Sequence, residues 1–136
     1  MKLLTDDLRN ALLRNGRLRR QFDEEGLAEP DFLPVVKLFT PDAGCTWLLT
    51  EIDPDEPDLA FGLCDLGLGY PELGNVSLSE LESVRGRLGL PVERDRHFAG
   101  LHTLSVYAHA AWNAAAITQN TKALAQAAAD LAGGAS

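Results

Sequence analysis

The sequence predicts an α+β protein in which a small antiparallel sheet of three to four strands is packed by an N-terminal helix, a short middle helix and a long C-terminal helix. Two observations lead to this class. Strand-forming segments follow one another in the middle of the chain, while helical patterns lie before and after them, an order typical of α+β proteins rather than of alternating β/α folds. The connections between the strands are short, which favours antiparallel pairing.

The N-terminal helix is predicted from its capping signals. Thr5 is suited to the N-cap, and Asp6 and Asp7 occupy the first turn, where the helix dipole favours negative charge. We expect Gly16 to close this helix, because glycine commonly ends helices. The polar connection over residues 17–31 is left open as a loop or a short helix.

Four strands are predicted from β-forming residues bounded by turn residues. They cover residues 34–39, 45–52, 58–65 and 73–76. In the third strand Ala60, Gly62 and Cys64 share one face, since strand side chains alternate. A face of such small residues predicts that a helix or a ligand approaches closely there.

A middle helix is predicted over residues 77–86, where Ser77 and Glu80 fit a capping box and Gly86 ends the helix. Residues 88–98 are expected to form a loop or a short extended segment. Alanine then dominates residues 103–131, which predicts one long helix. We therefore expect a single α+β domain over residues 1–115 and an alanine-rich helical extension and tail over residues 116–136.

Charge is distributed unevenly along the chain, whose net charge is −8. Residues 23–82 hold fifteen acids and one lysine, a net charge of −14, so direct binding of nucleic acid through the sheet would meet phosphate repulsion. No apolar run approaches the roughly 20 residues that span a bilayer, and the start of the chain lacks the pattern of a signal peptide. We expect a cytoplasmic protein with no membrane association.

An acidic hairpin is the predicted partner-binding surface. Its five carboxylates fall within eight residues: Glu51, Asp53, Asp55, Glu56 and Asp58. Such a row can imitate nucleic-acid phosphates toward a protein that binds them, or it can be a solvated hairpin tip. A basic group near the N-terminus has two interpretations as well, an anion-binding patch or a partner for the protein's own acids; it comprises Arg14, Arg17, Arg19 and Arg20.

Catalytic candidates are two loop acids, Asp65 and Glu72, at the ends of a glycine-rich run. Two carboxylates on a turn can act as an acid/base pair or bind a cation. As an alternative, Asp65 caps the turn and Glu72 is a solvated acid. A hydrolase or metal-dependent enzyme would combine the two acids with Glu93, Arg94 or His97.

The segment ERDRHF, residues 93–98, has a simpler structural interpretation. Arg94 or Arg96 can pair with Asp65 or Glu72 and so tie the loop to the sheet. Binding of a ligand carboxylate or phosphate by these arginines is the other interpretation.

No cofactor or metal site is expected. His97, His102 and His109 are too widely spaced to bind one metal without a third element. Cys45 and Cys64 form no C-x-x-C pair, and we expect them to be free thiols on a hairpin. They lie opposite each other if residues 45 and 64 are register partners, and on opposite faces if the register slips by one residue.

Several segments resemble one family: KLFTP, TWLLTE, FGLCDLGLGYPELG, SLSELESV and GLPVERD. They span residues 34–98, with LLT at residues 3–5 extending the match, and together they are similar to domain of unknown function family 2958 of bacteria, plasmids and phages. The resemblance implies a small cytoplasmic protein, often carried on mobile elements. It implies no established activity and no catalytic residue.

Three hypotheses follow. The favoured one is a non-enzymatic interaction or accessory protein of mobile elements, with an anti-defence role included, that binds a protein partner through the acidic hairpin. The alternative is the small hydrolase or metal-dependent enzyme with the loop carboxylates. A third hypothesis is a homo-oligomer that self-associates through the C-terminal helix.

Overall fold

A computed structural model describes residues 3–134 of the chain and confirms the α+β class. In chain order the elements are α1 (Asp6–Glu24), β1 (Val36–Phe39), β2 (Thr46–Ile52), β3 (Leu59–Asp65), β4 (Glu72–Ser77), α2 (Leu78–Ser83), β5 (Glu93–Arg94), α3 (Leu104–Ala114) and α4 (Thr121–Gly134).

The sheet is antiparallel throughout, and its five strands lie in the order β4-β3-β2-β1-β5. It has one strand more than the three to four expected, because β5 forms inside the segment predicted as a loop. In β5, Glu93 pairs with Phe39 and Arg94 with Leu38 of β1. A strand of two residues leaves no alternating pattern in the sequence, so only its pairing reveals it.

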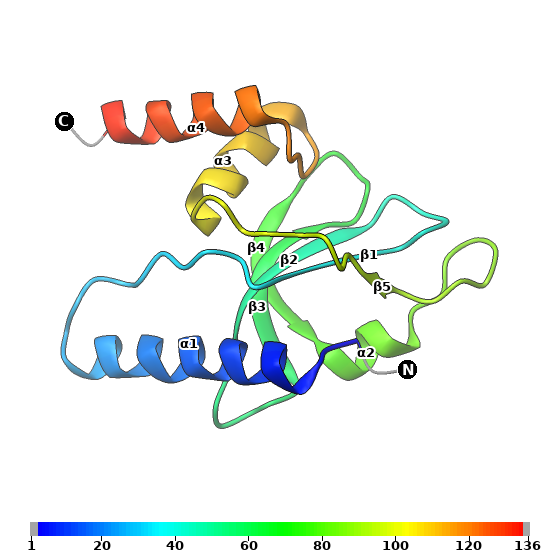
Figure 1. The fold of residues 1–136 in the computed structure, drawn as a ribbon, viewed down its shortest axis with the longest axis horizontal. Coiled ribbons are helices and arrows are strands. Elements are labelled where there is room, and N and C mark those ends of the chain that lie inside the picture. The colour runs from blue at the N-terminus through cyan, green and yellow to red at the C-terminus, as the bar shows by residue number, and fades with distance from the viewer. Residues whose placement is uncertain (1–2, 135–136) are drawn as a thin grey trace.

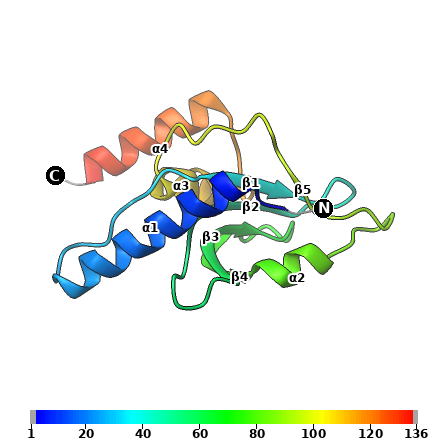
Figure 2. The same cartoon turned by 60° about the horizontal axis from the view of Figure 1, so that its bottom comes forward.

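Helices cover both faces of the sheet (Figures 1 and 2). Helices α1 and α2 lie on one side, and α3 and α4 lie on the other. Neighbouring residues of β2 serve the two cores, since strand side chains alternate. Leu49 packs in the core with Leu12 of α1, whereas Leu48 packs in the core with Tyr107 of α3.

Helix α1 runs past Gly16, where the sequence predicted its end, and stops at Glu24. Gly16 instead lies against the sheet, because a Cβ at this position would be 1.8 Å from the carbonyl oxygen of Ile52. The glycine that closes the helix is Gly26, just after its end, with φ +69°. There Leu27 N donates to the carbonyl of Phe22, a hydrogen bond typical of a glycine-terminated helix.

The predicted long C-terminal helix is wrong, because the structure divides it into α3 and α4. Ala115 adopts a left-handed conformation, with φ 61°, and ends α3. Asn120 starts the second helix by accepting a hydrogen bond from Ala123 N, 2.9 Å, on its side-chain oxygen. Helix α4 then packs back on α3 and buries Leu124 and Ala127. Alanine favours helix on both sides of the break, so composition does not mark it.

The middle helix begins as predicted, since the Ser77 hydroxyl accepts a hydrogen bond from Glu80 N, 3.2 Å. It ends at Ser83, before the predicted end at Gly86, because Val84 is extended.

The small-residue face of β3 is a place of close approach. A Cβ on Gly62 would lie 2.0 Å from the carbonyl oxygen of Leu48, so the neighbouring strand, not a helix or a ligand, requires this glycine. The partner of Cys64 across the sheet is Trp47 and not Cys45. Both thiols are free and pack beside the core that contains α1.

Within residues 3–134, no helix is both long enough and apolar enough to cross a bilayer.

Candidate functional site

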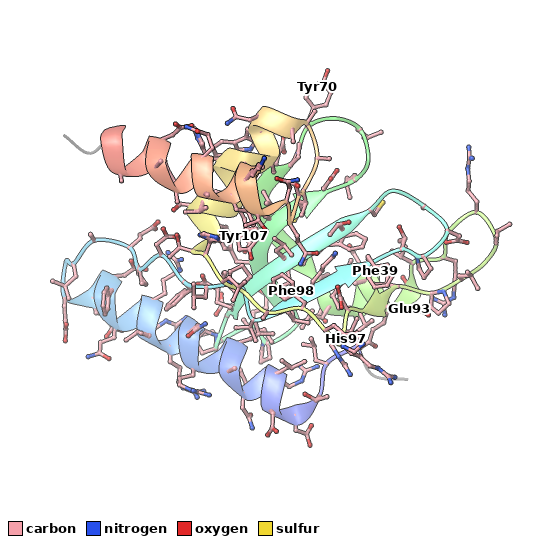
Figure 3. All side chains as sticks on the ribbon, turned by 45° about the horizontal axis from the view of Figure 1, so that its top comes forward. Phe39, Tyr70, Glu93, His97, Phe98 and Tyr107 are labelled. Atoms are coloured by element: carbon pink, nitrogen blue, oxygen red, sulfur yellow. The ribbon has the colours of Figure 1, made fainter. Side chains whose placement is uncertain are left out.

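The glycine-rich run forms a projecting loop, residues 66–71 between β3 and β4, which we call the apolar loop. Its large side chains face solvent: Leu66 is 56% exposed, Leu68 72% and Tyr70 79%. Two glycines alternate with them, Gly67 with φ +77° and Gly69 with φ +86°. Such positive φ values favour glycine and give the backbone an unusual course, so the loop displays its apolar side chains instead of burying them. In Figure 3, Tyr70 points away from the body of the molecule.

The apolar loop is held at both ends. Asp65, 4% exposed, accepts hydrogen bonds from Gly67 N at 2.8 Å and from Ile117 N at 2.9 Å. At the other end, the indole nitrogen of Trp112 donates to the Pro71 carbonyl at 2.8 Å. The loop is therefore fixed to β3, to α3 and to the connection between α3 and α4.

Its apolar surface extends beyond the loop itself. Leu73 at the start of β4 is 41% exposed, and Trp112 is 55% exposed although its indole nitrogen is bonded. The sequence does not mark Leu73 and Trp112 as surface residues, and in the run itself the acids are the more obvious candidates for chemistry. The alternation of glycine with Leu66, Leu68 and Tyr70 was the available signal.

The two candidate loop acids have different surroundings. Both carboxylate oxygens of Asp65 accept backbone N–H groups, so this residue caps the turn, as one of its two interpretations stated. Glu72 is exposed on the edge strand β4. Asp65 therefore holds the loop, and among residues 3–134 no second carboxylate takes part in its hydrogen bonds.

The predicted ion pair between ERDRHF and the loop acids is not formed. Glu72 belongs to β4 and Arg94 to β5, which are opposite edges of the sheet. The Arg94 guanidinium instead donates to the carbonyl of Leu3, 2.6 Å. The proposed catalytic set is therefore split, with Asp65 and Glu72 remote from the strand that carries Glu93.

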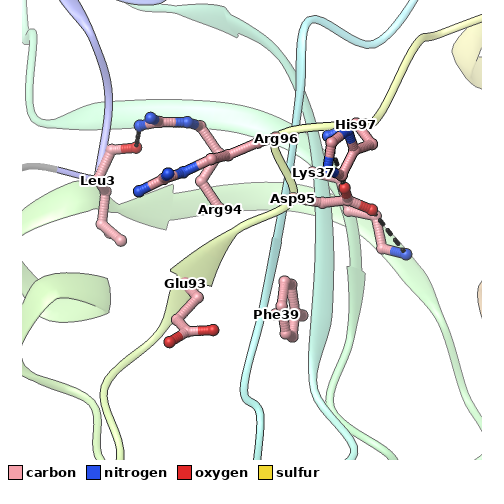
Figure 4. A pocket seen from close by; sticks show the side chains of 8 residues that line it. All are labelled: Leu3, Lys37, Phe39, Glu93, Arg94, Asp95, Arg96 and His97. Atoms are coloured by element: carbon pink, nitrogen blue, oxygen red, sulfur yellow. Dashed lines mark hydrogen bonds and ion pairs between the residues drawn. The ribbon is translucent and has the colours of Figure 1, made fainter.

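The other three members of that set line a groove beside β5, with a volume of about 610 Å³ (Figure 4). We call it the β5 groove, and its lining residues are Leu3, Lys37, Phe39, Glu93, Arg94, Asp95, Arg96 and His97. Glu93, Arg94, Arg96 and His97 are candidates that the sequence suggests. Lys37 and Phe39 carry no such signal in the sequence, and β1 brings them to the groove through its pairing with β5.

Most carboxylates of the acidic hairpin are bonded to other groups of the protein. Glu51 is 5% exposed and bonded to the Arg19 guanidinium, with 2.9 Å between Glu51 Oε1 and Arg19 Nη2. Arg20 lies 3.3 Å from a carboxylate oxygen of Asp53 and 2.8 Å from one of Asp55. Two of the four N-terminal arginines are therefore partners of the protein's own acids.

The remaining two hairpin acids differ. Asp58 accepts hydrogen bonds from the hydroxyls of Ser77 and Ser79 and from the Ser79 backbone, which lower the pKa of its carboxyl. Glu56 is exposed, and no side-chain hydrogen bond or ion pair forms on it among residues 3–134. It is the one acid of the hairpin whose side chain has no partner within the described residues, whereas Asp55, although paired with Arg20, is 78% exposed.

Arg19 lies in a second hollow, about 330 Å³, between α1 and the acidic hairpin. Its guanidinium also contacts two aromatic rings, 5.8 Å from the centroid of Phe32 and 5.7 Å from that of Phe61. The hydrogen bond with Glu51 raises the pKa of Arg19 against the opposing effect of burial. Arg19 and Glu51, which form a structural ion pair, are part of the lining of this hollow.

The histidines and cysteines lie in different parts of the described structure, with His97 in the β5 groove, His109 on α3, and Cys45 and Cys64 beside the core that contains α1. No set of metal-ligating side chains gathers anywhere in the described part of the chain. His109 lies 3.3 Å from Asp130 of α4. Burial raises the pKa of the Cys64 thiol to about 11, so this side chain is neutral near pH 7 and is a poor nucleophile.

These features define an α+β protein with a five-stranded antiparallel sheet, a projecting apolar loop and a groove of mixed charge. A family model described as Protein of unknown function (DUF2958) matches residues 3–118, and the chain belongs to that family. The match is wider than residues 34–98 and takes in α1, α3 and the residues that hold the apolar loop. No curated protein and no solved structure matches the chain.

Proposed function

We propose that this protein acts without catalysing a reaction, by binding a protein partner at the apolar loop. The observation that carries the proposal is the outward display of Leu66, Leu68 and Tyr70 on a backbone fixed at both ends. A contiguous exposed apolar surface is typical of an interaction site. Aromatic side chains such as Tyr70 and Trp112 are common among the residues that dominate binding energy.

The fixed backbone supports the same proposal. Ordering a flexible loop on binding costs free energy, and a loop already held in one conformation avoids that cost. Asp65 supplies this order from one side and Trp112 from the other. A glycine-rich loop that served only as a connection would need neither contact.

The acidic hairpin has a smaller part in this proposal. It lies at the start of β3 and the apolar loop lies at its end, so the two surfaces are at opposite ends of one strand. Glu56, together with the exposed Asp55, offers negative charge to a basic partner. An accessory role on a mobile element, anti-defence included, belongs to the proposal through the family resemblance alone.

The hydrolase alternative has less support, because its carboxylates do not converge. Both oxygens of Asp65 accept backbone N–H groups that hold the loop, and the groove residues lie on the far edge of the sheet. A general acid or base must reach a substrate proton at hydrogen-bond distance.

Capture of host proteins by the purified, immobilised chain tests the proposal. We expect partner proteins bound by the wild type to be lost with the double variant Leu68→Ser, Tyr70→Ser. The matched control is Leu88→Ser, Leu101→Ser, which removes two equally exposed leucines outside the loop, 80% and 78% exposed, and should leave capture intact. Equal capture by all three proteins would overturn the proposal. A Glu56→Lys variant, measured across salt concentrations, separates the contribution of the acidic hairpin.

A further inference from the structure

Strand β4 forms an open edge of the sheet. It pairs with β3 on one side, and no strand of residues 3–134 pairs with its other side (Figure 2). Proteins commonly protect such edges with lysine, proline, a bulge or a very short strand. β4 has six residues, ELGNVS, without lysine or proline, and its register with β3 is continuous, whereas β5 at the opposite edge has two residues. The β4 edge is therefore suited to the addition of another strand.

The hydrogen bonds at the end of the ladder show which backbone groups of β4 point outward. Leu78 N donates to the Asp58 carbonyl, 2.8 Å, in register with the β3–β4 pairing. Bonded and non-bonded pairs alternate along an antiparallel ladder, so the next residue of β4 that bonds to β3 is Val76, followed by every second residue before it. The N–H and C=O groups of Leu73 and Asn75 consequently point away from β3, where no described segment pairs with them.

The two faces of β4 differ in chemistry. Leu73, 41% exposed, pairs with Leu63 of the core beneath α3, and the exposed Trp112 of α3 is bonded to the end of the apolar loop beside it. Glu72 lies on the other face, because side chains alternate along a strand. It is exposed and forms no ion pair within residues 3–134. Gly74 follows on that face, with open space where a Cβ would be.

These faces determine which side chains an added strand should carry. Its side chains would alternate between the same two faces as those of β4. Apolar residues beside Leu73 would extend the exposed apolar surface by cross-strand contact. On the other face, the long stem of a lysine or arginine can lie over the bare backbone of Gly74 and bring its charge to the carboxylate of Glu72.

A second copy of the chain fits this edge less well. Antiparallel pairing of two β4 strands around Gly74 would place Glu72 of each copy opposite Val76 of the other, close to the start of α2. Helix α2 carries Glu80 and Glu82, which are exposed and form no ion pair in the described part of the chain. Like charges brought together across a strand pair are destabilising, and each copy has a net charge of −8.

We propose that β4 binds an extended segment of a protein partner as a sixth strand of the sheet, with apolar side chains beside Leu73 and a lysine or arginine over Gly74 at Glu72. This inference rests on the proposed function and specifies the form of its partner, since β4 begins where the apolar loop ends. In such strand addition the backbone hydrogen bonds supply affinity, and the alternating side chains supply specificity.

Selection from a phage-displayed library of random peptides on the full chain tests the edge. It should enrich sequences in which apolar residues alternate with polar ones that include lysine or arginine. When an enriched synthetic peptide binds, amide hydrogen exchange should slow at Leu73 and Asn75, whose N–H groups become bonded, and change little at Gly74 and Val76, which already bond to β3. Selection that enriches no peptide, or binding that leaves exchange at Leu73 and Asn75 unchanged, would overturn the proposal.

Variants of β4 locate the binding. Asn75→Pro removes an outward N–H while the bonds to β3 remain, and proline is tolerated on edge strands. It should weaken peptide binding about tenfold or more. The matched control is Asn75→Thr, which changes the same side chain but keeps the N–H and should bind as the wild type does. Glu72→Lys, which leaves the backbone intact, should weaken basic peptides at low salt and lose this effect at high salt. Equal affinity in the wild type and both Asn75→Pro and Glu72→Lys would exclude the edge.

The loop variant Leu68→Ser, Tyr70→Ser separates this inference from the proposed function. A partner protein lost by the loop variant but retained by Asn75→Pro would overturn strand addition and leave the apolar loop as the binding site. Peptides lost by Asn75→Pro but retained by the loop variant would support the edge and count against the loop. Sedimentation of the free chain covers the other occupant, because a dimer that Asn75→Pro dissociates would assign the edge to a second copy and overturn the proposal.

Discussion

Arg19 joins three parts of the chain that are distant in sequence. From α1 it bonds the buried carboxylate of Glu51 on β2, and it contacts the Phe32 ring and Glu29 in the connection before β1. Arginine suits this position, because its planar guanidinium can bond a carboxylate and lie against an aromatic ring together. Together with Arg20, which pairs with Asp53 and Asp55, this side chain links the acidic hairpin to α1.

Replacing Arg19 by Gln should therefore be costly. Glu51 would be left buried without its ionic partner, which typically costs about 3–5 kcal/mol; because Arg19 itself is partly exposed, we expect the lower part of that range. Chemical denaturation measures the change. Arg20→Gln is the control, since its exposed pairs with Asp53 and Asp55 should contribute less than about 1 kcal/mol. Equal losses in both variants would contradict this account.

The Cys64 thiol gives a pH-dependent prediction. Its folded pKa is raised to about 11, above the ordinary value of 9.0, so folding favours the neutral thiol. In a Cys45→Ser background, alkylation of Cys64 should stay slow from pH 7 to about pH 9, where an ordinary thiol becomes reactive. The stability that this group contributes is present below the unfolded pKa and is lost as the pH rises toward the folded value. Rapid alkylation in the native protein at pH 8 would contradict the burial of the thiol.

At the scale of elements, Asp65 connects the sheet with the C-terminal helices. It ends β3, caps the turn at Gly67 and holds Ile117 in the connection between α3 and α4. Its two oxygens thus fix the start of the apolar loop and the place where the helical segment breaks. One buried carboxylate therefore links the sheet to both segments.

Asp65→Ala should leave two backbone N–H groups without their acceptor. We expect a loss of roughly 1–3 kcal/mol in the free energy of unfolding, the cost of one unsatisfied group at half-buried Ile117, since water can replace the lost bond at exposed Gly67. Hydrogen exchange should accelerate at Gly67 and Ile117 in particular. Glu72→Gln on the adjacent strand is the control and should change stability by less than about 0.5 kcal/mol, because Glu72 is exposed. Uniform acceleration across the whole sheet would argue against a local clamp.

Local signals predicted the element boundaries where a cap or a turn determines them. Thr5 begins α1 and Ser77 begins α2 because each hydroxyl accepts a backbone N–H in the first turn, which is a short-range interaction. Gly16 led to a wrong helix end because a glycine can either end a helix or allow close packing. Here it allows close contact with Ile52, a residue far away in sequence. β5 likewise depends on its pairing with β1, which its own two residues do not signal. The break at Ala115 is not marked by the alanine-rich sequence around it.

The candidate site could likewise be predicted only in part. The sequence indicated the glycine-rich run and the segment ERDRHF as candidates. In the structure the run forms the apolar loop, and the segment lines the β5 groove. The expected ion pair between them failed because strand order is a tertiary property: β4 and β5 are at opposite edges. Lys37 and Phe39 could not be predicted as groove residues before the pairing of β1 with β5 was known.

At the scale of the whole molecule, α4 completes the second core, although the family match ends at residue 118. Leu124 and Ala127 are buried against α3, which in turn packs on the sheet. A chain shortened to residues 1–118 should keep the core between α1 and the sheet but lose protection from hydrogen exchange in α3. Exchange measured by mass spectrometry follows both regions at once, and unchanged protection in α3 would contradict a structural role for α4.

The contact between Arg94 and Leu3 has a consequence for folding kinetics. Its partners are separated by 91 residues, and closing so long a loop costs more chain entropy than any hairpin of the sheet. Contacts of that separation form late, after local pairings have shortened the effective loop. The antiparallel neighbours β2, β3 and β4 can assemble first, and β5 joins the edge at the end. The β5 groove is therefore among the last parts of the molecule to form, and its edge is where the native protein should open first.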